Sequence, residues 1–140
     1  MSKAERVVLV DGSSLIFRAY FAIPGNLTSP EGLPTNAILG FTNMFRKLFA
    51  GKRPAFGAVA FDVSAPTFRS KEYPEYKAHR SRMPDDLRVQ LPYIDKVVAA
   101  FGFPAVRMPG YEADDVIGTL TREAVEAGHD VVIVSSDKDF

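Results

Sequence analysis

The chain has 140 residues, with 17 lysines and arginines against 17 aspartates and glutamates, and it contains neither cysteine nor tryptophan. Its length suits one domain, and its 46% apolar and 24% charged residues exclude an intrinsically disordered chain. The absence of cysteine excludes disulfides, thiolate catalysis and cysteine-ligated metal sites. No apolar run approaches the roughly 18–20 residues of a membrane span, so we expect a soluble cytoplasmic protein without a membrane partner.

The first predicted element is a strand over residues 6–10, a continuous apolar run that leads into Asp11. A helix is expected over residues 38–49, where apolar side chains recur on one helical face. A second apolar run, residues 55–61, predicts another strand, which ends at Asp62. Both strands are therefore followed directly by a carboxylate.

The second half of the chain continues the alternation. A helix is expected over residues 87–101, kinked or divided by Pro92. A short strand over residues 104–108 and a helix over residues 116–127 follow, and residues 131–134 form the last predicted strand. Strands that alternate with helices predict an α/β fold, a mostly parallel, Rossmann-like sheet with helices on both faces.

The neutral total charge conceals an uneven distribution. Residues 109–140 carry eight acidic and two basic residues, a balance of −6, whereas residues 1–108 carry nine acidic and 15 basic residues, a balance of +6. Such asymmetry suggests a polyanionic partner on one side of the molecule and cations on the other.

Seven carboxylates are expected at one edge of the sheet, because the carboxyl ends of parallel strands meet there. They are Asp11, Asp62, Glu112, Asp114, Asp115, Asp137 and Asp139. Oxygen ligands without cysteine favour a hard ion such as Mg²⁺ or Mn²⁺. Taken singly, Asp11 is better explained as a turn residue or helix N-cap, and acids in a first helical turn such as Asp114 and Asp115 complement the helix dipole. The run from Asp137 to Asp139, taken alone, could be a solvated turn. Asp115 is the weakest candidate, because it cannot point the same way as Asp114.

A basic segment over residues 68–82 follows Asp62. It holds five lysines and arginines, two acids and three aromatic residues, and it lacks an apolar stripe. Cations interleaved with aromatic rings suit a nucleic-acid strand, and Lys77 and Arg80 are spaced to face one run of phosphates on a helix. The alternative is a solvated surface helix.

Other chemistries lack their motifs. No G-x-G-x-x-G or Walker A sequence occurs, which leaves nucleotide-cofactor binding without support. Ser13 and Ser14 follow the first strand without a G-x-S-x-G elbow, so we interpret them as helix-capping or turn residues.

An ordered set of motifs resembles the 5′ nuclease (flap endonuclease) superfamily, most closely the N-terminal 5′→3′ exonuclease domains of bacterial DNA polymerase I. The motifs are V-L-V-D-G at 8–12, F-D at 61–62, F-R at 68–69, Y-K-A-H-R at 76–80, P-G-Y-E-A-D-D-V at 109–116 and S-S-D-K-D at 135–139. The resemblance implies a PIN-like fold, a basic helical arch and two divalent ions that serve hydrolysis of DNA at a 5′ flap or 5′ end.

The resemblance also implies a role for each matching residue. Asp11, Asp62, Glu112 and Asp114 would build the first metal site with Asp115 at its edge, Asp137 would lie between the metals, and Asp139 would bind the second. Lys77 and Arg80 would act on the scissile phosphate, Tyr76 would stack on a base, and Arg18 and Arg69 would contact phosphates.

The family pattern continues with two more aspartates and a helix–hairpin–helix, neither of which occurs in these 140 residues. We therefore expect residues 1–140 to be the N-terminal portion of one exonuclease domain, a monomer in the bacterial cytoplasm near the nucleoid, normally continuous with the hairpin part and in some proteins with a polymerase. The alternatives are a PIN-type ribonuclease and an inactive DNA-binding fragment.

Overall fold

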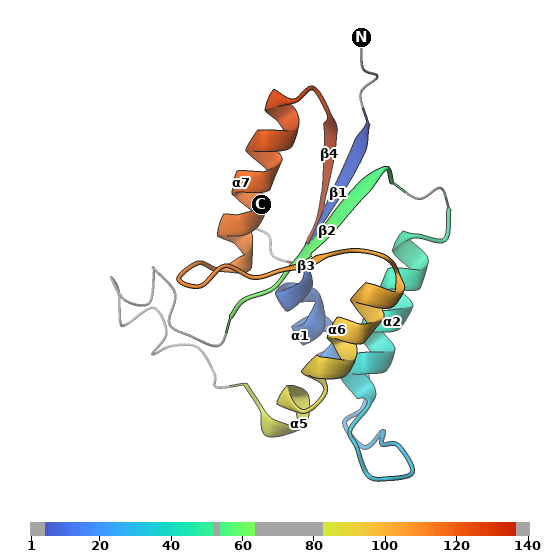
Figure 1. Cartoon of the computed structure of the whole chain (residues 1–140). Helices are drawn as coiled ribbons and strands as arrows, with labels where there is room; N and C mark the ends of the chain where they lie inside the picture. Colours follow the sequence, from blue (N-terminus) through green and yellow to red (C-terminus); the bar gives the residue numbers. More distant parts are fainter. Residues whose placement is uncertain (1–4, 52–53, 64–82, 137–140) are drawn as a thin grey trace.

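The computed structural model describes residues 5–51, 54–63 and 83–136 (Figure 1). The strands are β1 (Arg6–Asp11), β2 (Phe56–Ala60), β3 (Ala105–Val106) and β4 (Asp130–Val134). The helices are α1 (Gly12–Ala22), α2 (Asn36–Leu48), α5 (Asp85–Arg88), α6 (Leu91–Ala100) and α7 (Ala113–Glu126). None of the helices in these ranges is long and apolar enough to span a membrane.

The strands form one parallel sheet in the order β3-β2-β1-β4. Asp11 lies beside Ala60 of β2, and Ala60 lies beside Val106 of β3. On its other side, β1 pairs Val10 with Val134 of β4. The predicted parallel α/β sheet is confirmed, and the register brings the ends of β1, β2 and β4 to the same edge.

Alternating side chains of the strands build an apolar layer on each face of the sheet. Val8, Val10 and Val59 pack toward α1, α2 and α6, in a cluster that includes the buried rings of Phe41 and Phe45. Val7, Leu9, Ala58 and Ala60 belong to the opposite layer, which Val116 and Ile117 of α7 complete. Figure 1 shows α7 on one side of the sheet and α2 and α6 on the other. Strands buried on both faces explain the continuous apolar runs.

Helix α1 was not among the elements predicted from the sequence. It begins directly after Asp11, whose side chain accepts a hydrogen bond from the backbone N–H of Ser14 and so caps the helix. Leu15, Ile16 and Ala19 form its buried face. This spacing was the available signal, and the adjoining strand, which is equally apolar, obscured it.

The predicted helix over residues 87–101 is divided at its proline. Pro92 lies in the first turn of α6, where its missing N–H costs no helical hydrogen bond. The buried side chain of Gln90 fills the junction between α5 and α6. Its Oε1 accepts from the backbone N–H of Ile38 at 3.0 Å, and its Nε2 donates to Asn36 Oδ1 at 3.0 Å and to the Asp86 carbonyl at 2.8 Å. This amide therefore joins the start of α2 to the α5–α6 corner.

Candidate active site

Asp11, the last residue of β1, is buried, with a relative exposure of 5%. One carboxylate oxygen accepts from the backbone N–H of Ser14 at 3.1 Å, and the other accepts from the hydroxyl of Ser135 at 3.0 Å. Burial raises the pKa of Asp11 above its ordinary value, the two serine hydrogen bonds lower it in part, and the nearby charge of Asp62 raises it further. The two carboxylates are thus close enough to repel each other.

Asp62 follows the end of β2 and joins it to two other elements. Its backbone N–H donates to the hydroxyl of Ser13 at 2.8 Å, at the start of α1. Its carboxylate accepts from the backbone N–H of Ala113 at 2.7 Å, in the first turn of α7. The positive end of the helix dipole favours a carboxylate at this point. Asp62 therefore sets the start of α7 against the end of β2.

The start of α7 carries three more of the seven predicted metal ligands: Glu112, Asp114 and Asp115. Glu112 is its buried N-cap residue, and its backbone N–H donates to the carboxylate of Asp115 at 3.0 Å in a capping box. The Asp114 carboxylate accepts from the backbone N–H of Asp115 at 3.0 Å. The interpretation of Asp114 and Asp115 as helix-start residues is therefore confirmed, whereas their role as metal ligands stays a prediction.

The structure brings Asp11 and Asp62 together but does not assemble a metal site within the described ranges. No three histidines or acids in residues 5–51, 54–63 and 83–136 form a group that could hold a metal ion. The physical reason is that the carboxylates of Asp62 and Asp115 are turned onto the backbone of α7. Asp137 and Asp139 lie outside the described residues.

The residues predicted to meet nucleic acid are described only in part. Arg18 is exposed on α1, the helix that begins at Asp11. Arg69, Tyr76, Lys77 and Arg80, and with them the predicted arch, lie outside the described residues. Sequence reasoning did not single out Arg107, which follows β3 at the same edge of the sheet. Its guanidinium lies 4.5 Å from the ring centre of Phe61 and 2.7 Å from the carboxylate of Asp95.

Three serines that support the carboxylates were also missed as parts of the site. Ser13 accepts from the backbone of Asp62, Ser14 caps toward Asp11, and Ser135 donates to the Asp11 carboxylate. The signal was present, because each small hydroxyl residue comes within three positions of a strand end. The expected capping role of Ser13 and Ser14 was local. It did not include the hydrogen bond from Asp62 to Ser13, which joins the end of β2 to the start of α1.

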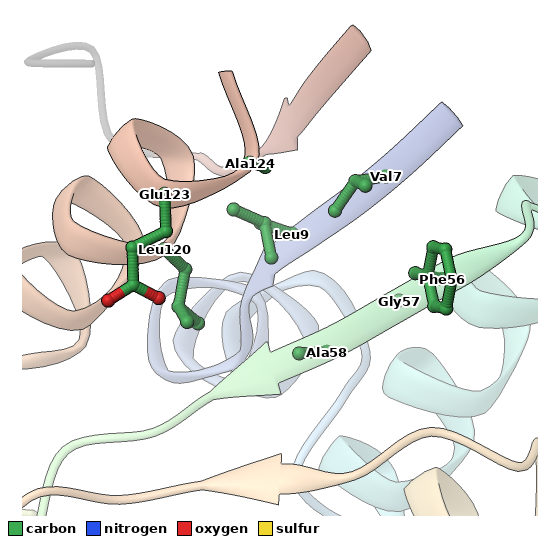
Figure 2. A pocket seen from close by; sticks show the side chains of 8 residues that line it. All are labelled: Val7, Leu9, Phe56, Gly57, Ala58, Leu120, Glu123 and Ala124. Atoms are coloured by element: carbon green, nitrogen blue, oxygen red, sulfur yellow. The ribbon is translucent and has the colours of Figure 1, made fainter. Parts of the chain in front are cut away.

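An apolar groove of about 310 Å³ lies on the α7 face of the sheet (Figure 2). Its lining comes from β1, β2 and α7: Val7, Leu9, Phe56, Gly57, Ala58, Leu120, Glu123 and Ala124. Among the described residues that line the groove, Glu123 supplies the only charged side chain, and none is a lysine or arginine. A phosphate ligand does not fit such a lining, so the carboxylate edge is the candidate site.

Comparison with known proteins identifies the family of the chain. The family described as "5'-3' exonuclease, N-terminal resolvase-like domain" matches residues 6–140. The chain is 46% identical over 134 residues to DNA polymerase I of Caldicellulosiruptor bescii, covering 96% of this chain and 16% of that protein. It is 44% identical over 136 residues to the 5'-3' exonuclease of Aquifex aeolicus, covering 97% of this chain and 47% of that protein.

Solved structures share the fold at lower identity. A phage T5 5'-exonuclease with bound divalent metal ions (zinc) matches with a TM-score of 0.59 and 22% identity, covering 96% of this chain and 50% of that one. A T5 flap endonuclease in complex with DNA and metal ions matches with a TM-score of 0.58 and 21% identity, covering 95% and 49%. The chain therefore spans about half or less of these relatives, and it belongs to the family of 5'-3' exonuclease N-terminal resolvase-like domains.

Proposed function

We propose that this chain is the N-terminal part of a metal-dependent 5′→3′ exonuclease and 5′-flap endonuclease that hydrolyses DNA phosphodiester bonds in replication and repair. The observation that carries the proposal is the pair Asp11 and Asp62, held at one edge of the sheet beside the start of α7. The relatives named 5'-3' exonuclease and DNA polymerase I support it, as does the fold shared with a nuclease solved with DNA and metal ions.

The donor set of this edge fits a hard divalent cation. A buried carboxylate beside a second one is costly unless positive charge offsets the repulsion, and all candidate ligands are oxygens. Asp11, Asp62, Glu112 and Asp114 would hold a first Mg²⁺ or Mn²⁺ ion, with Asp115 at its edge, whereas Asp137 and Asp139 would reach a second. When bound, such ions polarise a phosphoryl oxygen and activate water.

The basic segment would supply the remaining functions. Lys77 and Arg80 would act as catalytic residues that offset charge on the scissile phosphate, and Tyr76 would stack on a base. Arg18 and Arg69 would bind flanking phosphates of a DNA 5′ flap or 5′ end. We place the protein, as a monomer, in the bacterial cytoplasm near the nucleoid, joined to a helix–hairpin–helix part and in some proteins to a polymerase.

The test replaces single carboxylates in the purified protein. Asp62→Ala and Asp114→Ala should each abolish Mg²⁺-dependent cleavage of a labelled 5′-flap duplex, because each removes a predicted ligand. Binding of the same duplex, measured in EDTA by fluorescence anisotropy, should stay within about threefold, since phosphate contacts by cations dominate affinity. The assay is run with DNA and with a single-stranded RNA of matched sequence.

Asp130→Ala is the matched control, because Asp130 is exposed at the amino end of β4, opposite to the site edge. It should cleave like the wild type. Cleavage that survives either Asp62→Ala or Asp114→Ala would overturn the ligand assignment. RNA cleavage without DNA cleavage would favour a PIN-type ribonuclease, and DNA binding without any cleavage would favour a binding fragment.

A further inference from the structure

The hydroxyl of Ser135, at the end of β4, donates a hydrogen bond to the carboxylate of Asp11, at the end of the neighbouring strand β1. Ser135 directly follows β4, and the register that pairs Val10 with Val134 sets it beside Asp11. Val131 and Leu9 pack toward α7, so strand alternation sends Asp11 and Ser135 to that same face. The result is a hydrogen bond of 3.0 Å from Ser135 Oγ to Asp11 Oδ2.

We propose that Ser135 is a positioning residue that orients the Asp11 carboxylate for a divalent cation. A carboxylate offers about four acceptor sites on its two oxygens. Ser14 and Ser135 each occupy a site on a different oxygen, which fixes the plane of the group and leaves acceptor sites for a metal ion. Hydrogen-bonded partners of ligating carboxylates typically change metal affinity by about 10–100-fold when they are removed.

A merely structural role for this hydroxyl would be to join the end of β4 to the β1–α1 junction. Ser136 already does so through Ser14 at the start of α1, without touching the Asp11 carboxylate. Its backbone N–H donates to Ser14 Oγ at 3.1 Å, and its own hydroxyl donates to the Ser14 carbonyl at 3.1 Å. Ser136 therefore provides a matched control, because its side chain links the end of β4 to Ser14, at the start of α1, without touching Asp11.

The experiment measures Mn²⁺ binding by isothermal titration calorimetry in the purified protein. Ser135→Thr keeps the hydroxyl, and Ser135→Val replaces it with a methyl group in nearly the same volume. We expect Ser135→Thr to stay within about twofold of the wild type, and Ser135→Val to bind Mn²⁺ at least about tenfold more weakly. Ser136→Ala should bind Mn²⁺ as the wild type does. Thermal unfolding in EDTA verifies that each variant is folded, and Ser135→Ala replaces the valine variant if that one does not fold.

Equal Mn²⁺ affinity of Ser135→Thr and Ser135→Val would overturn the inference, and so would an equal loss in Ser136→Ala. The absence of any Mn²⁺ binding by the wild type would overturn it together with the assignment of Asp11 as a ligand. The inference rests on the metal site of the proposed function, but the experiments distinguish a failure of the Ser135 role from a failure of the nuclease activity. The expected order of Mn²⁺ affinities in a protein that cleaves neither DNA nor RNA would support Ser135 and reject the nuclease.

Discussion

Asp11 combines a structural role with a chemical one. Its carboxylate caps α1 through Ser14, yet burial and the charge of Asp62 raise its pKa. An N-cap exposed to water would give the same helix at a lower electrostatic cost. The ionised carboxylate therefore stabilises the metal-free fold less than the protonated one would, which is the pattern expected of a group held ready for a cation.

The stability of the metal-free protein should report this strain. Because the pKa of Asp11 is raised in the folded state above its ordinary value of 3.8, the folded protein keeps a proton that the unfolded chain has lost. The contribution of Asp11 to stability therefore falls as pH rises from about 3.8 through the folded pKa, and it stays low above it. Asp11→Asn should gain stability relative to the wild type as pH rises from 4 to 7.

Urea unfolding in EDTA across that pH range measures the difference between Asp11→Asn and the wild type. Asparagine does not titrate and can still accept from the backbone of Ser14, so the cap survives. Asp130→Asn, at the opposite end of the sheet, controls for the loss of one negative charge. If the free energy of unfolding of Asp11→Asn, relative to that of the wild type, stayed constant or fell with rising pH, burial would not raise the pKa of Asp11.

At the scale of elements, one glycine determines how closely β2 approaches the helical layer. A Cβ on Gly57 would lie 2.3 Å from Cε1 of Phe103, a buried ring whose centre is 4.7 Å from that of Phe49. Gly57→Ala should therefore destabilise the protein by about 1–3 kcal/mol, as overpacking does. Gly118→Ala on the exposed face of α7 meets no atom within 4 Å and should stabilise it by about 1 kcal/mol.

Chemical denaturation measures the change in the free energy of unfolding for both variants, expected to be a loss for Gly57→Ala and a gain for Gly118→Ala. The pair controls for the change in backbone entropy, because each replaces a glycine by alanine without a positive φ. Stabilisation by Gly57→Ala would mean that the Phe103 ring moves at little cost, contrary to a closely packed layer between β2 and α2.

The sequence predicted those elements whose pattern is long or sharply bounded. The three apolar runs became β1, β2 and β4 within one residue of the expected limits, and Pro92 marks the division between α5 and α6. The strand expected over residues 104–108 is shorter in the structure, where β3 has only two residues. Helix α1 was not predicted, because its apolar residues follow those of β1 closely. Only the cap at Asp11 separates the strand pattern of β1 from the helical pattern of α1.

For the candidate site, topology could be predicted and side-chain contacts could not. Parallel strands necessarily bring Asp11 and Asp62 to one edge. Whether a carboxylate there faces a cation or a helix N-terminus depends on local geometry, and the capping box turns Asp115 onto Glu112. The support from Ser135 depends on the register between β1 and β4, which no local pattern specifies.

At the scale of the whole molecule, the neutral charge total is the sum of two opposed parts. The acidic excess lies in residues 109–140, which include the start of α7, and the basic excess lies in residues 1–108. Arg18 belongs to the basic part and is exposed on α1, six residues after the start of that helix. A rise of about 1.5 Å per residue sets its Cα about 10 Å along the helix from Asp11.

DNA affinity should therefore depend on salt although the protein carries no net charge. Each phosphate contact contributes about −0.9 to the slope of log K against log salt for duplex DNA. Arg18→Ala should reduce the magnitude of that slope by about 1, measured by fluorescence anisotropy of a 5′-flap duplex in EDTA. Arg122→Ala is the matched control, because Arg122 is also exposed on a helix but precedes Glu123 in the acidic part. Equal slopes for Arg18→Ala and the wild type would remove α1 from the DNA interface, and an equal reduction by Arg122→Ala would mean that total charge, rather than its placement, determines binding.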